Sequence, residues 1–184
     1  MDAFRLATVA EPVTTTTGPS PGELTAQVAT LPDVLDRVVG SRLDRVRPAV
    51  RWGIGAGHDD ASAGAHAEIA IRTARDRGSW LGFATGDPWR DALLADLVVA
   101  LAALLDDLTP RQAEIAGRVL VDGARQAEVA AALGVSRATV SVAVARGRLP
   151  AIASARRAIE SILVGPPPVA LGGGEGTAPA ARPR

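Results

Sequence analysis

The sequence contains no cysteine, and all 20 of its basic residues are arginine. Without cysteine the chain cannot form a disulfide framework, a thiolate metal site, an iron–sulfur cluster or a cysteine nucleophile. Proteins that need no disulfides are typical of the reducing cytosol, so we expect a cytoplasmic location.

Long hydrophobic runs are also missing. The longest apolar run, Leu97 to Leu105, has nine residues, about half of the ~18–20 that a membrane span needs. The first 13 residues include Asp2 and lack the apolar segment of a signal peptide. We therefore expect neither a membrane-spanning segment nor export, although 47% hydrophobic residues are enough to build a folded core.

Signs of catalysis are absent as well. Only two histidines occur, and no nucleophile–base pair or carboxylate pair stands in a recognisable motif. Gly53, Gly55 and Gly57 lack the spacing of a dinucleotide-binding loop and fall inside a predicted strand, where glycines for close packing are the simpler interpretation. We predict no enzymatic activity, no cofactor and no metal site.

The net charge is zero, but it is unevenly distributed. Residues 1–108 carry ten arginines and fifteen acidic residues, whereas residues 109–163 carry eight arginines and four acidic residues. An acidic half joined to a basic half is typical of a sensing or partner-binding domain attached to a nucleic-acid-binding domain.

The acidic half has short β-type and helical segments in alternation. This order predicts an α+β protein whose residues 1–90 form a small α/β domain of ferredoxin-like or palm-like type. The helix in its middle is expected to begin at an N-cap Ser62 and to end at Gly78. The expected elements are a strand over 4–13, one or two helices within 23–46, a strand over 49–57, a helix over 62–78 and a strand over 80–85.

Residues 91–107 predict a leucine-rich helix that connects the two halves. Its leucines at 93, 94, 97, 101, 104 and 105 are expected on one side. That side is either part of the core or a contact in a homodimer. At the other end of the chain, residues 164–184 lack hydrophobic periodicity and are expected to form a disordered tail.

Residues 108–163 carry the clearest pattern, and we interpret them as a helix-turn-helix domain. Thr109, Pro110 and Gln112 form the start of a helix, with a capping box around proline at the first helical position. A second helix is expected from Arg125 to Leu133 and a third from 137 to 146. Gly134 and the N-cap residue Ser136 between them provide the tight turn.

The outer face of the third helix has the chemistry to read a DNA major groove. Arg137 can donate two hydrogen bonds to guanine, Ser141 can bond a base or a phosphate, and Ala138 or Val142 can contact a thymine methyl group. The amides at the helix starts near Arg125 and Ser136 suit phosphate oxygens. The predicted DNA-binding residues are Gln126, Ser136, Arg137, Ala138, Thr139, Ser141, Val142, Arg146 and Arg148.

Two families resemble parts of the chain. Residues 108–149 resemble the helix-turn-helix of sigma-factor region four and of LuxR-type regulators. Residues 1–163 resemble the bacterial SatD-like family through the stretch Trp52–Gly57 and the helix-turn-helix, with Glu11 in place of that family's acidic strand motif. The resemblance implies an α/β half followed by a DNA-binding helix-turn-helix.

We therefore predict a sequence-specific regulator of transcription that binds double-stranded DNA as a homodimer. One alternative is a module whose helix-turn-helix docks on RNA polymerase or another protein. A second alternative is a degenerate nucleotide-binding domain, because the segment from Trp52 to Gly86 is also similar to the end of nucleotidyl-cyclase and GGDEF palm domains. Those enzymes need paired acidic metal ligands on strands, which this segment lacks.

Overall fold

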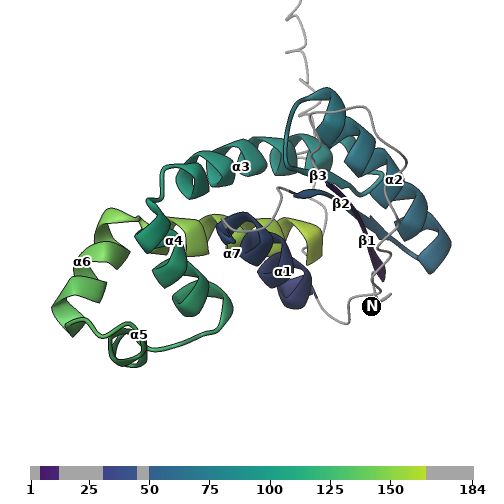
Figure 1. Ribbon diagram of the computed structural model, residues 1–184. Coiled ribbons are helices and arrows are strands. Elements are labelled where there is room, and N and C mark those ends of the chain that lie inside the picture. Colours follow the sequence, from purple (N-terminus) through teal and green to yellow (C-terminus); the bar gives the residue numbers. More distant parts are fainter. Residues whose placement is uncertain (1–4, 13–30, 45–49, 165–184) are drawn as a thin grey trace, which may run out of the picture.

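A computed structural model describes residues 5–12, 31–44 and 50–164. The fold is α+β, as predicted: a three-stranded sheet is followed by a helical region (Figure 1). The strands are β1 (Arg5–Pro12), β2 (Val50–Gly57) and β3 (Leu81–Ala84). The helices are α1 (Leu31–Leu43), α2 (Asp60–Asp76), α3 (Pro88–Asp106), α4 (Pro110–Ala116), the π-helix η1 (Gly117–Val121), α5 (Gln126–Ala132), α6 (Arg137–Arg146) and α7 (Leu149–Val164).

The sheet has the order β1-β2-β3. β1 pairs antiparallel with β2, and β2 pairs parallel with β3, with α2 as the crossover helix between them. Side chains alternate between the two faces of a strand, so β2 presents its glycines to one face and Trp52, Ile54 and Ala56 to the other. The second set belongs to the main hydrophobic core.

The glycine face of the sheet packs directly on α2. A Cβ atom on Gly53 would stand 2.6 Å from the carbonyl oxygen of Ala67, and one on Gly55 would overlap the backbone of Ala63. Ala63 and Ala67 are themselves fully buried. The glycines are thus packing glycines, as predicted, and they allow the helix backbone to lie against the strand without intervening side chains.

An ion-pair cluster ties the edge strand to its neighbours. Glu11 on β1 is buried, and its carboxylate accepts hydrogen bonds from Arg51 Nη1 at 2.7 Å and from the guanidinium of Arg75 on α2. The bond from Arg75, with the smaller contribution of Arg51, holds the pKa of Glu11 below its ordinary value despite the opposing effect of burial. This residue therefore has a structural role in joining β1, β2 and α2.

The other face of the sheet packs against α1 and α3, and α7 packs in turn on α3. α3 and α7 lie side by side and extend from the sheet towards the helical end of the molecule (Figure 1). One continuous core contains residues of the sheet, Leu94, Leu101 and Leu105 of α3, and Ile152 and Ile159 of α7. The predicted leucine side of α3 is therefore largely internal.

Some predicted boundaries were wrong. Asp59, not Ser62, is the N-cap of α2; Ser62 is the N3 residue of a capping box and bonds back to Asp59. The connecting helix begins at Pro88, not at residue 91, because Asp87 caps it by accepting from the amides of Trp89 and Arg90. Proline suits this first turn, where its missing N–H costs no hydrogen bond.

Other expected features agree with the structure or lie outside it. Gly78 follows α2 with a φ of +64°, the left-handed conformation expected of a terminating glycine. Residues 165–184 of the expected tail and residues 23–30 lie outside the described residues, whereas Val164, the first residue of the expected tail, is the last residue of α7. Within the described part, no single helix is long and apolar enough to span a membrane; only α5 and α6 taken together meet that test, and they are bent by 114°.

Candidate nucleic-acid interface

α5 and α6 are two short helices joined by a tight turn, with the geometry of a helix-turn-helix, at the end of the molecule opposite the sheet (Figure 1). The bend of 114° between them is in the usual range for this motif. Gly134, with a φ of +63°, makes the turn. The amides of Gly134 and Val135 donate to the carbonyls of Ala131 and Ala130, a Schellman arrangement that closes the end of α5.

α4 supports the motif from behind and begins as predicted. Thr109 Oγ1 accepts from the amide of Gln112 at 3.3 Å, and the Gln112 side chain accepts from the amide of Thr109 at 2.9 Å. The sequence pattern did not show that the helix widens into the π-helix η1 after Ala116. π-Helical turns are rare and are often found at functional sites.

A small core holds the three helices together. Ile115 of α4, Val129 and Ala130 of α5 and Val140 of α6 are buried and form a cluster of their own, which we call the HTH core. Val119 of η1 packs against both the HTH core and the main core. Ala130 of α5 is buried in this cluster, and its small side chain suits a close approach of α5 and α6.

The outer face of α6 that is predicted to read DNA, which we call the reading face, is exposed to solvent. Arg137, Ala138, Ser141 and Val142 are all exposed, and Val142 keeps 49% of its surface open to solvent. The exposed residues at 137, 138, 141, 142 and 145 follow the helical repeat, so they share one side of α6. This arrangement matches the expected outer face, although their contact with DNA remains a prediction.

The side chains of Ser136 and Thr139 belong to the N-terminal cap of α6. Ser136 Oγ accepts from the Thr139 amide at 3.1 Å and lies 2.8 Å from Thr139 Oγ1. Both hydroxyl groups are exposed. The cap fixes the start of α6, and a hydroxyl has more than one hydrogen-bonding site, so the two side chains can still reach a phosphate.

An open hollow brings together residues from the starts of α5 and α6. Arg125, Gln126 and Arg137 line it with two alanines, and its volume is about 530 Å³. Arg125 was not among the predicted DNA-binding residues. Its position directly before Gln126, which was among them, could have indicated that it lies at the same surface. The amide of Arg125 donates to Glu128 Oε2 at 2.8 Å, so it is engaged within the chain, and the phosphate contact expected at this helix start would fall to the amides that follow it.

The exposed arginines of this region differ in their pairing. Arg111 and Arg118 form ion pairs with Glu114. Within the described ranges, by contrast, no carboxylate pairs with the exposed arginines of the α5–α6 surface and of the turn after α6. These are Arg125, Arg137, Arg146 and Arg148.

Arg148 is also conformationally unusual. It is the one described non-glycine residue with a positive φ, at +51°, and it connects α6 to α7. A left-handed backbone is unfavourable for a side chain with a Cβ atom. The arginine thus occupies a position that glycine would fill without strain, and its exposed guanidinium stays near the end of the reading helix.

One family model matches part of the chain. Residues 98–164 match the TrfB plasmid transcriptional repressor, a match that runs from the second half of α3 to the end of α7. This family differs from the SatD-like, sigma-factor and LuxR-type families that the sequence resembles. Comparisons with curated proteins and with solved structures gave no match. The segment that contains the helix-turn-helix is therefore similar to a family of transcriptional repressors, over just over a third of the chain.

Proposed function

We propose that this protein is a sequence-specific repressor of transcription that inserts α6 into the major groove of double-stranded DNA. The observation that carries the proposal is the set of four exposed arginines around an outer face of α6 with small side chains; none of the four pairs with a carboxylate in the described part of the chain. The match of residues 98–164 to the TrfB plasmid transcriptional repressor supports it. A DNA-binding regulator needs no catalytic residues, and we propose that the protein is not an enzyme. We also propose a cytoplasmic location, as expected from the sequence, because a repressor of transcription must reach the DNA.

The arginines suit two kinds of contact. Arg137 stands in the first turn of α6, where its planar guanidinium can bond guanine O6 and N7. Arg146 is the last residue of α6 and Arg148 follows shortly after it, so both lie at the other end of a helix that is ~15 Å long, where they can reach the phosphate backbone. Gln126 and Arg125 lie beside Arg137 at the hollow and suit the opposite backbone strand.

We propose that the active species is a homodimer. A single helix-turn-helix buries little DNA surface, whereas two half-sites ~34 Å apart roughly double the contacts. Leu94, Leu101 and Leu105 are buried within one chain, so these three leucines of α3 do not support the dimer. Sedimentation at micromolar protein is expected to give a dimer, and a monomer that binds a single asymmetric site tightly would contradict this part.

Docking on RNA polymerase or another protein is the second candidate. The exposure of Val142 favours it, because an apolar side chain at the centre of the reading face also suits a protein surface. The nucleotide-binding alternative has less support, since the backbone of α2 fills the space beside Gly53 and Gly55 that a phosphate would need.

Binding to duplex DNA at several salt concentrations tests the proposal. Contacts between arginine and phosphate release counterions, so the logarithm of the affinity should fall linearly with the logarithm of the salt concentration, with a slope of about −0.9 for each phosphate contacted. Selection from a random duplex library should then yield one preferred sequence. No binding to any duplex at low salt would favour the protein-docking alternative.

A further inference from the structure

The reading face of α6 has two chemically different edges. Each residue of an α-helix is rotated by about 100° from the one before it. Arg137 and Ser141 therefore lie about 40° apart around the helix and form a polar edge. Ala138 and Val142 lie about 100° and 140° from Arg137 and form an apolar edge. Ala145 lies between the two edges.

The polar edge faces the start of α5. Arg137 lines the open hollow there together with Arg125 and Gln126, whereas the two residues of the apolar edge, both within the described part of the chain, do not line it. The apolar edge therefore points away from α5. When α6 lies in a major groove, the two edges meet different parts of the base pairs, so each edge can select its own base.

Val142 is the largest side chain of the apolar edge. Residues 109–148 are all described, and among their large apolar side chains only Val142 is strongly exposed, with 49% of its surface open to solvent. Ala138, one turn earlier, extends the apolar strip along the helix. The apolar group that an A·T pair offers in the major groove is the C5-methyl group of thymine. The apolar edge thus matches thymine.

The charges beside the apolar edge favour DNA over another protein as its partner. Arg146 lies four positions after Val142, next to it on the same side of α6, and Arg148 follows in the turn. Within the described residues neither arginine pairs with a carboxylate, and α6 contains no acidic residue. Two uncompensated cations at the end of an apolar strip suit a surface that places methyl groups beside phosphates, and a thymine-containing major groove is such a surface.

The short side chains of the reading face allow a close approach to the bases. Ala138, Ser141 and Ala145 add little bulk, so Val142 can come within the ~4 Å of an apolar contact. Arg137 and Val142 are five residues apart, which is ~7.5 Å along the helix axis and about two base-pair steps of 3.4 Å. A thymine read by Val142 therefore lies within about three base pairs of the guanine read by Arg137.

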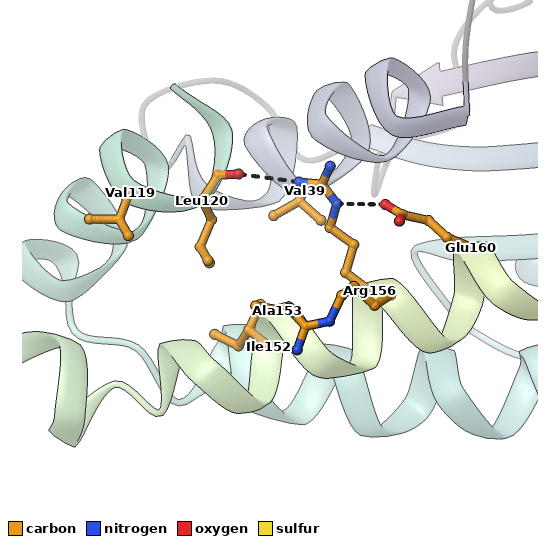
Figure 2. A pocket seen from close by; sticks show the side chains of 8 residues that line it. Val39, Val119, Leu120, Ile152, Ala153, Arg156 and Glu160 are labelled. Atoms are coloured by element: carbon orange, nitrogen blue, oxygen red, sulfur yellow. Dashed lines mark hydrogen bonds and ion pairs between the residues drawn. The ribbon is translucent and has the colours of Figure 1, made fainter. Parts of the chain in front are cut away.

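The unit that carries α6 is held firmly against the rest of the chain. Arg156 of α7 donates to the carbonyl oxygen of Leu120 in η1 and to Glu160 Oε1, each at 3.2 Å (Figure 2). Its guanidinium also pairs with Asp36 of α1. Val119 of η1 packs in turn against the HTH core. A rigid support keeps the reading face in one geometry, as the selection of a single base requires.

We propose that Val142, together with Ala138, recognises the C5-methyl group of a thymine that lies within about three base pairs of the guanine contacted by Arg137. The inference rests on the proposed function, and it adds the base that the apolar edge selects. One guanine and one thymine methyl group then define the preferred half-site.

Deoxyuridine is the probe, because it lacks only the C5-methyl group of thymidine and pairs with adenine in the same way. Each thymine of the selected duplex is replaced in turn, and the affinity of the full chain is measured. The wild type should lose about fourfold at one thymine, the change expected when one methyl group leaves an apolar contact, and little at the others. Equal affinity for all substituted duplexes, or a sensitive thymine far from the guanine, would overturn the inference.

Two valine variants test the assigned residue. Val142→Ala should bind the unsubstituted duplex several-fold more weakly and should no longer distinguish thymine from uracil at the sensitive position. Val99→Ala is the matched control: Val99 lies on α3 with 69% of its surface exposed, so this variant should keep the fourfold difference. Both valines lie outside the two hydrophobic cores, so both variants should fold. Undiminished discrimination by Val142→Ala would contradict the role of Val142.

Failure of this inference can be told apart from failure of the proposed function. No binding to any duplex at low salt refutes the proposed function, whereas sequence-specific binding without a methyl-sensitive thymine refutes the inference alone. Arg137→Ala tests the separation of the edges: it should weaken binding to the selected duplex yet keep the fourfold difference between thymine and uracil. Loss of that difference in Arg137→Ala would show that the apolar edge does not select a base by itself.

Discussion

Glu11 on β1 and Arg75 on α2 are 64 positions apart in sequence, yet they form a hydrogen-bonded ion pair that clamps the edge strand to the sheet. Arg51 binds the same carboxylate from β2. The pair explains how β1, which has a neighbour on one side only in the described sheet, is held in place.

This pair predicts a pH dependence of stability. The pKa of Glu11 is lowered in the folded state by Arg75 and Arg51, so the folded protein binds a proton less readily than the unfolded chain. The stabilisation is complete above the ordinary glutamate pKa of 4.5 and is lost as the pH falls through the lower folded value. Glu11→Gln should cost roughly 1–3 kcal/mol at pH 7. In urea melts at several pH values, the difference in stability between variant and wild type should narrow as the pH falls below the ordinary glutamate pKa of 4.5; a constant difference would contradict the assignment.

The close contact between β2 and α2 gives a second prediction. Gly55→Ala would place a methyl group into the backbone of Ala63 and should destabilise the fold by about 3 kcal/mol or more, since rigid backbone has to move. Gly64→Ala is the matched control: it lies within α2 and a Cβ there meets no atom within 4 Å. That substitution should stabilise by roughly 0.5–1 kcal/mol through helix propensity. Equal melting temperatures for the two variants would show that the strand and helix are not in close contact.

The positive φ of Arg148 gives a third prediction, in which stability and binding change in opposite directions. Arg148→Gly relieves the left-handed strain and should stabilise the fold by about 1 kcal/mol, whereas Arg148→Ala keeps a Cβ atom and should not. Both variants lose the same charge, so both should weaken binding to specific and random DNA alike and reduce the salt slope by about one. Tighter DNA binding by the glycine variant would show that the arginine does not contact DNA.

Sequence patterns predicted the helix-turn-helix more accurately than the rest of the fold. The capping box at Thr109, the turn glycine Gly134 and the cap at Ser136 are local features, and local features determine where these helices begin and end. The start of α2 was misplaced because Asp59 and Ser62 are both good caps and only the folded backbone decides between them. The ion pairs of Glu11 and Arg156 join distant parts of the chain and leave no local pattern. The π-helix after Ala116 packs against α1 and accepts a hydrogen bond from Arg156 of α7 at the carbonyl of Leu120, and contacts between such distant segments leave no local sequence pattern.

The most direct test compares wild type with Arg137→Ala on the selected duplex and on random duplex of equal length. Arg137 is exposed at the start of α6 and outside both hydrophobic cores, so the variant should keep the wild-type fold. The account predicts a loss of ~1–3 kcal/mol on the selected duplex, little change on random DNA, and relaxed preference at one base pair. Wild-type affinity of the variant for both duplexes would show that α6 does not read bases, and would contradict the proposed function.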